Sequence, residues 1–187
     1  ARTALQAKSP EELVNEVLIP ALDTVGAGFE KGVLFLPQLL QSAGAAQAAF
    51  EVVKDAIAAS GKKSGGKGKI IVATVKGDIH DIGKNIVKTL LENYGYDVLD
   101  LGRDVPAETV VKAAQEHGVR LVGLSALMTT TLGSMEETIC ALRRAGLSCR
   151  VMVGGAVLTP EYAMHIGADY YAKDAKQSVD IAREVLG

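Results

Sequence analysis

The stretch IIVATVKGDIHDIG at residues 70–83 decides the fold of this chain. Its first six residues form an apolar run that predicts a strand, and residues 84–94 after it are typical of a helix. A strand that turns directly into a helix belongs to an α/β sheet, where ligands bind at the carboxyl edge. We therefore expect residues 78–83 to lie at a ligand-binding edge.

Four more strand-like segments follow, with helical segments between them. They are Asp97–Leu101, Leu121–Ser125, Arg150–Val153 and Asp169–Ala172. Four helices are expected to end at a glycine that takes the left-handed conformation, namely Gly95, Gly118, Gly146 and Gly167. This alternation predicts an α/β fold with a five-stranded, parallel, doubly wound sheet in the flavodoxin-like order, whose switch point lies beside the first strand.

The first 60 residues have a helical pattern and predict a small helical bundle, which we call the cap. Apolar residues at steps of three and four mark two helices: Leu13, Val17, Ala21, Val25 and Phe29, then Leu39, Ala43, Ala46, Phe50, Val53 and Ile57. The sequence Ser9-Pro10-Glu11-Glu12 is a helix start signal, and Pro37 suits a first helical turn. Since only a short segment precedes Ser9, the bundle is expected to lack one helix.

Residues 61–69 lie in a run of glycine, serine and lysine, SGKKSGGKGK at 60–69, which predicts a flexible linker. The expected domains are therefore the cap at 1–60, the linker at 61–69 and a Rossmann-like domain at 70–187. Hinge motion of the cap about this linker is a further expectation.

Composition excludes several classes of protein. A net charge of −2 and only 4% aromatic residues argue against nucleic-acid binding. No apolar run has the length of a membrane span, and no signal-peptide pattern is present, so a cytoplasmic protein is expected. Cys140 and Cys149 are expected to be reduced, small core residues.

His80 is the candidate metal ligand. Asp78, two residues earlier, can accept a hydrogen bond from one ring nitrogen and leave the other for a metal. No Cys/His cluster completes a zinc site, and a lone histidine suits a metal held by a macrocycle, in a haem or a corrinoid. A loop histidine satisfied by its neighbours is the alternative, and His117 and His165 are expected simply to lie in last helical turns.

Two further loops carry residues that suit a ligand. The hydroxyls of 125–131 (SALMTTT) can bind one or can cap the helix that follows, and both interpretations stay open. Gly154-Gly155 allows a ligand to lie against the backbone, or forms a plain tight turn. Phosphate-binding glycine motifs and nucleophile arrangements do not stand out.

These motifs together resemble a known family. Asp78-x-His80-x-x-Gly83, Ser125-x-Leu127 and Gly154-Gly155 are similar to the signature of cobalamin-binding domains that hold the cofactor base-off, with histidine on cobalt. The cap segment FEKGVLFLPQ at 29–38 resembles the methyltransferase branch. The resemblance covers nearly the whole chain and extends to small corrinoid proteins and the matching module of methionine synthase.

The resemblance implies roles for individual residues. His80 would be the lower axial ligand of cobalt, and Asp78 and Thr131 would form a hydrogen-bond relay behind it. Ser125 would contact the dimethylbenzimidazole of the nucleotide tail, whose slot the three motif glycines would line. Phe29 and Leu36 would cover the upper face. The implied cofactor-binding set is Phe29, Leu36, Asp78, His80, Asp81, Ile82, Gly83, Ser125, Leu127, Thr129, Thr131, Gly154 and Gly155.

The resemblance also implies a function: a methyl-carrier protein that shuttles a methyl group on cobalt between a substrate-specific and an acceptor-specific methyltransferase. Such a corrinoid subunit has no substrate site of its own. A reductive activase is an expected further partner, whereas nucleic acid and membrane are not. The alternatives are a mutase module, a cobalamin-sensing regulator and a receiver-like signalling domain.

Overall fold

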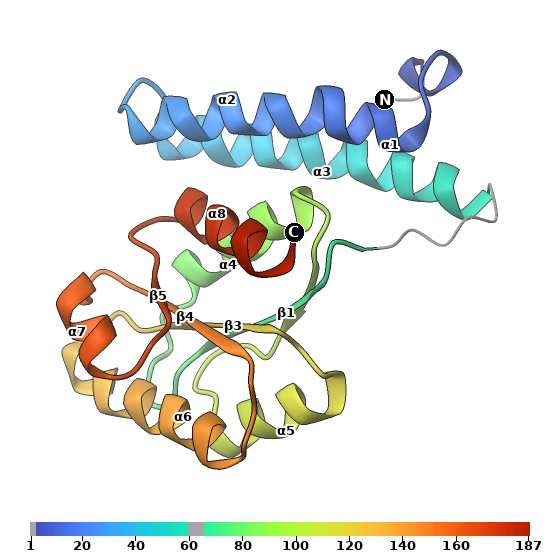
Figure 1. The fold of residues 1–187 in the computed structure, drawn as a ribbon. Helices are drawn as coiled ribbons and strands as arrows, with labels where there is room; N and C mark the ends of the chain where they lie inside the picture. Colours follow the sequence, from blue (N-terminus) through green and yellow to red (C-terminus); the bar gives the residue numbers. More distant parts are fainter. Residues whose placement is uncertain (1–2, 60–65) are drawn as a thin grey trace. The chain divides into compact units, whose positions relative to one another are not determined.

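The computed structural model describes residues 3–59 and 66–187, which belong to two compact units, Ala1–Gly65 and Gly66–Gly187 (Figure 1). The expected linker at 61–69 falls largely outside the described residues. Of its described part, Lys69 already belongs to the first strand.

The second unit is a five-stranded parallel sheet with the order β2-β1-β3-β4-β5. Its strands are β1 (Lys69–Thr74), β2 (Asp97–Asp100), β3 (Leu121–Ser125), β4 (Arg150–Gly154) and β5 (Tyr170–Tyr171). This is the predicted flavodoxin-like order, and every predicted strand is present, although β5 is shorter than expected. The order reverses between β1 and β3, so the loops that follow these two strands flank the switch point.

Helices cover both faces of the sheet (Figure 1). Helices α4 (Ile82–Asn93) and α8 (Ala175–Leu186) pack together on one face, and α5 (Ala107–His117) and α6 (Leu132–Arg144) pack together on the other. A short α7 (Pro160–His165) contacts β5. The α5/α6 side holds the main core, in which Val110, Met135 and Leu142 are nearly inaccessible.

The four glycines expected to end helices do so. Gly95, Gly118, Gly146 and Gly167 have φ angles of 90°, 57°, 69° and 82°. The left-handed conformation lets each helix stop and the chain turn back toward the next strand.

The first unit contains α1 (Pro10–Leu13), a π-helical turn (Val14–Leu18), α2 (Ile19–Glu30) and α3 (Leu36–Ala59), after a 3₁₀ turn at Ala4–Gln6. The start signal is confirmed as a capping box: Ser9 N–H donates to Oε2 of Glu12 at 2.8 Å, and Glu12 N–H donates to Oγ of Ser9 at 3.2 Å. The apolar stripe predicted for the second cap helix, now α3, is confirmed at Leu39, Ala43 and Val53, which are buried.

The predicted apolar stripe of the first cap helix is wrong at Val17 and Ala21, which are exposed, whereas Val25 and Phe29 are half-buried. Val17 is 42% exposed, whereas Leu22 and Gly26 are buried. The π turn inserts one extra residue, which moves the buried stripe one position along the chain.

The cysteine prediction holds for one residue only. Cys149 is buried beside β4, but Cys140 lies exposed on α6 and is not a core residue. Among the described residues, no helix combines the length and apolar character that a bilayer crossing requires.

Candidate functional site

The carboxyl ends of three neighbouring strands form the floor of the candidate site. Thr74 pairs in register with Ser125, and Ser125 pairs with Gly154, so the three residues lie in one row across β1, β3 and β4. The Oγ atoms of Thr74 and Ser125 are 3.5 Å apart. The loop at 75–81 and the loop at 126–128 rise from this row on both sides of the switch point.

Asp78 is the centre of the hydrogen-bond network in these loops. Its side chain is fully buried, and each carboxylate oxygen has its own donors. Oδ1 accepts from His80 N–H at 3.0 Å and lies 2.9 Å from His80 Nδ1. Oδ2 accepts from the N–H groups of Leu127 at 2.7 Å and Met128 at 3.2 Å, and from Oγ1 of Thr131 at 2.9 Å. Asp78 thus joins the β1 and β3 loops.

These donors set the charge of Asp78. Burial alone would raise its pKa, but hydrogen bonds from His80 N–H, Leu127 N–H, the His80 ring and Thr131 outweigh burial and hold the pKa well below its usual range. Asp78 is therefore an ionised carboxylate, which can only accept hydrogen bonds.

The state of Asp78 decides which nitrogen of His80 carries the proton. Because the carboxylate accepts, neutral His80 holds its proton on Nδ1 and keeps a lone pair on Nε2. The His80 side chain is 45% exposed, and the apolar side chains of Ile79, Ile82 and Leu127 are exposed around it. One ring nitrogen is satisfied, and the other is available to a ligand with an apolar face.

The donor set fits a metal that brings its own ligands. Among the described residues, no group of three or more His, Cys, Asp or Glu side chains could hold a metal ion. His117 and His165 are exposed at the last residues of α5 and α7, as expected. A single imidazole suits the axial position of a metal whose other positions a macrocycle fills.

Thr131 precedes α6, yet its hydroxyl makes no cap hydrogen bond to that helix. Oγ1 lies 2.9 Å from Oδ2 of Asp78 and 2.8 Å from the carbonyl oxygen of Met128. The capping interpretation is therefore wrong for Thr131, whereas Thr129 is an exposed residue at the start of the 3₁₀ turn Thr129–Thr131.

The motif glycines differ in what they allow. A Cβ on Gly155 would lie 1.8 Å from the carbonyl oxygen of Ala126, and one on Gly154 would lie 3.0 Å from that of Ala172. These glycines let backbone segments approach each other. Gly83 is different, because a Cβ there would meet nothing within 4 Å, so its missing side chain leaves open space beside α4.

The sequence of residues 68–180 matches a family model described as a B12 binding domain, and residues 1–54 match a second model with the same description. The chain belongs to the B12-binding corrinoid proteins. Cobalamin, or a related corrinoid, is its cofactor.

Relatives of this corrinoid protein are similar over nearly the whole chain. It is 44% identical to dimethylamine corrinoid protein 1 of Methanosarcina acetivorans over 95% of this chain and 84% of the relative. A cobalamin-binding protein from Desulfitobacterium hafniense superposes with a TM-score of 0.85 at 34% identity, covering 100% of this chain and 88% of the other. The methanol:cobalamin methyltransferase complex MtaBC from Methanosarcina barkeri gives 0.84 at 34% identity, covering 99% and 71%.

The two residues expected to cover the cofactor do not share one helix. Phe29 lies near the end of α2 and is half-buried, whereas Leu36 begins α3 and is 41% exposed. Gly32, with φ of 69°, breaks the helix between them. Val33 and Phe35, which the sequence reasoning did not select, are more exposed, at 70% and 63%.

Sequence reasoning also missed an ion pair at the start of α4. Nζ of the buried Lys84 donates to Oδ1 of Asp100 at 2.7 Å, and Lys88 lies 3.4 Å from Oδ2. Burial would raise the pKa of Asp100, but the bonds from Lys84 and from Gly102 N–H lower it overall. The apolar pattern of a helix does not indicate that one of its lysines is buried. The only available signal was that Lys84 directly follows Gly83, the last residue of the Asp78–Gly83 motif.

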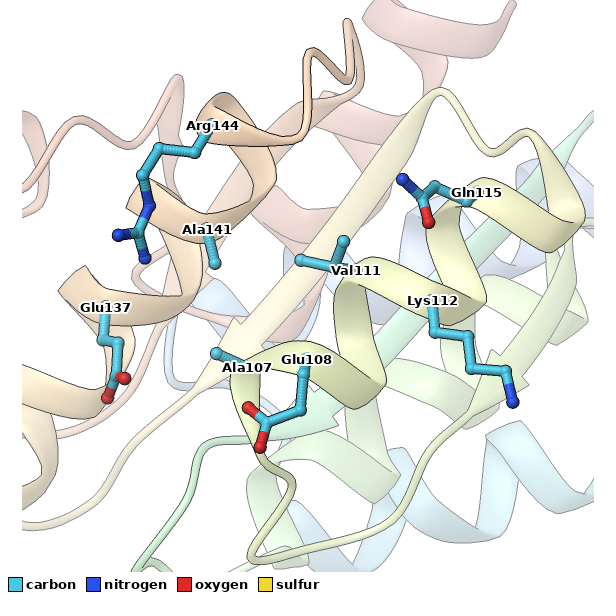
Figure 2. Close-up of a pocket in the computed structure, with 8 residues that line it drawn as sticks. All are labelled: Ala107, Glu108, Val111, Lys112, Gln115, Glu137, Ala141 and Arg144. Carbon is cyan, nitrogen blue, oxygen red and sulfur yellow. The ribbon is translucent and has the colours of Figure 1, made fainter.

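A separate hollow of about 330 Å³ lies between α5 and α6 (Figure 2). Ala107, Val111 and Ala141 contribute small side chains, and charged groups from both helices surround them. None of the sequence-predicted site residues lines this hollow, so it is distinct from the network around His80.

Proposed function

We propose that this corrinoid protein carries a methyl group on cobalt between two methyltransferases, with His80 as the lower axial ligand. The observation that carries the proposal is the bond between Nδ1 of His80 and the buried, ionised Asp78, which keeps Nε2 free for cobalt. When bound, the corrinoid supplies a cobalt atom that can take up and release a methyl group. The residues of this chain orient the imidazole and modulate its basicity.

Exchange of His80 tests the ligation. His80→Ala should weaken cobalamin binding or shift the absorption spectrum of the bound cofactor. His165→Ala is the matched control, because His165 is an exposed histidine in the same unit. An unchanged spectrum and affinity in His80→Ala would rule out His80 as the ligand.

The base-off form requires a slot for the nucleotide tail, which we assign to Ser125, Thr129 and the motif glycines. Gly83 gives a sharp test, because a Cβ there meets no protein atom within 4 Å. Gly83→Leu should fold normally and bind cobinamide, which lacks the tail, as the parent does. Its affinity for cobalamin should fall, and equal losses for both corrinoids would contradict the tail slot.

Phe29 and Leu36 are proposed to shield the upper face of the corrin. Loss of the two side chains should expose a cobalt-bound methyl group to solvent and speed photolysis of bound methylcobalamin. The comparison is Phe29→Ala/Leu36→Ala against Val17→Ala, which removes an exposed apolar side chain elsewhere in the cap. Equal photolysis rates in the two variants would place the shield on other residues, of which Val33 and Phe35 are the first candidates.

The proposed partners are a substrate-specific methyltransferase, an acceptor-specific methyltransferase and a reductive activase. The names of the relatives point to methylated amines and methanol as the donors to try first. The experiment measures transfer of an isotope-labelled methyl group from dimethylamine or methanol to the cobalamin-loaded protein, with the matching methyltransferase present. Failure of all simple methylated donors would remove the carrier role and leave only cobalamin binding.

Methyl transfer also requires the shield to leave the cofactor, and the linker at 61–69 is proposed to permit this. Gly65→Pro/Gly66→Pro should slow transfer between partners and leave cobalamin affinity intact, because proline stiffens a glycine-rich segment. Equal transfer rates in the stiffened variant would make the segment a passive connection.

A further inference from the structure

Asp104, in the loop between β2 and α5, has an unusual backbone conformation. Its φ angle is 53°, and among the described residues it is the non-glycine residue with a positive φ. A side chain in this left-handed region is strained, although aspartate tolerates it better than most residues. Strain of this kind persists only where surrounding contacts impose it, and it is concentrated at functional sites.

The contacts that impose it lead directly to the His80 loop. The N–H of Asp104 donates to the carbonyl oxygen of Asp78 at 2.9 Å, and Oδ1 of Asp104 accepts from Gly77 N–H at 2.7 Å. Gly77 has a φ of 84°, so it forms the tight turn before Asp78. Asp104 thus holds both residues of this turn, Gly77 and Asp78. Val105 N–H donates to the carbonyl oxygen of Thr74 at 3.0 Å and anchors the loop to the end of β1.

We infer that Asp104 is a positioning residue for cobalt ligation, acting through the turn that carries Asp78 and His80. Oδ2 of Asp78 is fixed from the β3 side by Leu127 and Met128. The geometry at Oδ1 depends instead on the backbone of residues 77–80, because both of its donors belong to His80. Asp104 fixes that backbone and so determines how the ring of His80 meets Oδ1.

This inference rests on the proposed role of His80, and two substitutions separate positioning from plain stabilisation. Asp104→Gly keeps the N–H bond to Asp78 and relieves the backbone strain, but it removes the acceptor for Gly77 N–H. Asp104→Asn keeps both a side-chain oxygen and tolerance of the left-handed region. Arg103→Gly alters the same loop without touching either bond, so it serves as the control.

The first measurement uses cobalt-free protein. ¹⁵N NMR of His80 should show the Nδ1–H tautomer in the parent, in Asp104→Asn and in Arg103→Gly. Asp104→Gly should show a mixture of both tautomers, while its urea midpoint stays close to that of the parent because relief of strain offsets the lost bond. A purely structural residue would change the midpoint and leave the tautomer unchanged, and that result would overturn the inference.

The second measurement uses protein loaded with cob(II)alamin. Asp104→Gly should bind cobalamin about 10-fold more weakly, the lower end of the range for residues behind a metal ligand, and Asp104→Asn should restore the affinity. Equal affinities in the parent and Asp104→Gly would overturn the inference. Labelling the histidines with ¹⁵N separates their nitrogen from that of the cofactor's own base: a Co(II) EPR spectrum of the labelled parent that shows only ¹⁴N splitting would refute the proposed ligation, whereas the cobalt-free tautomer still tests Asp104.

Discussion

Replacement of Asp78 by asparagine exchanges one of two accepting oxygens for a donating amide group. The oxygen of asparagine is expected to face Leu127 and Met128, because two backbone N–H groups converge there. The amide group then faces His80 N–H and Nδ1. Nδ1 can adapt by becoming an acceptor, which moves the ring proton to Nε2, but the backbone N–H of His80 cannot adapt.

The magnitude follows from that one unpaired donor. Leaving a polar group without its partner costs about 1–3 kcal/mol, so the free energy of unfolding of the second unit should fall by about this amount. A proton on Nε2 blocks the position proposed for cobalt, and cobalamin affinity should fall by about 10–100-fold. The matched control is Asp97→Asn at an exposed ion pair, where changes stay within about 0.5 kcal/mol.

The chain provides a convenient assay for this prediction. All five tyrosines lie beyond residue 66 and there is no tryptophan, so tyrosine fluorescence during urea unfolding reports on the second unit alone. ¹⁵N NMR of His80 reads the tautomer directly. If Asp78→Asn keeps the Nδ1–H tautomer and the affinity of the parent, then Asp78 is only a turn residue, and the assignment of Nε2 to cobalt loses its basis.

Three further outcomes follow from the same structure. The lowered pKa of Asp78 stabilises the folded state fully above the unfolded pKa of about 3.9 and less as pH falls toward the folded value, so the stability difference between parent and Asp78→Asn should shrink in urea titrations below about pH 4. Gly155→Ala should cost more than about 1–3 kcal/mol, because the new Cβ overlaps a backbone oxygen at 1.8 Å in addition to the strain at φ of 148°, whereas Gly133→Ala, in open space on α6, should be neutral or stabilising in the same urea assay. Lys84→Met should cost up to about 3–5 kcal/mol by leaving Asp100 without its main partner, and Lys84→Met/Asp100→Asn should recover part of this loss, because the amide removes the buried charge and keeps an oxygen for Gly102 N–H; a double variant as unstable as the single one would contradict the ion-pair explanation.

The parts of the fold that sequence predicted are those set by local chemistry. Glycines at 95, 118, 146 and 167 end helices because they alone take the left-handed conformation cheaply, and all four do. The cap shows the limit of this reasoning. The π turn at Val14–Leu18 leaves no trace in composition, yet it displaces the buried stripe by one residue.

The residues of the site also fall into those that local sequence could predict and those that it could not. Asp78 and His80 are two residues apart, so sequence spacing alone could suggest their pairing. Asp104 is 26 residues from Asp78, and its contribution depends on a backbone angle that no residue type dictates. Thr131 was ambiguous for a related reason, because a hydroxyl before a helix is equally suited to capping until the position of Asp78 is known.

The hydrogen bonds from Leu127, Met128 and Thr131 to Asp78 span 49, 50 and 53 residues of chain. They can form only after β1 and β3 have paired, so a partly folded chain holds neither the carboxylate nor the ring of His80 in place. If His80 holds the corrinoid as proposed, the cofactor is a ligand of the native state and adds about 2.7 kcal/mol to its stability at a free concentration of 100 times Kd. A larger supply of the cofactor is then expected to raise the folded fraction of the protein, so that loading and lifetime should rise together.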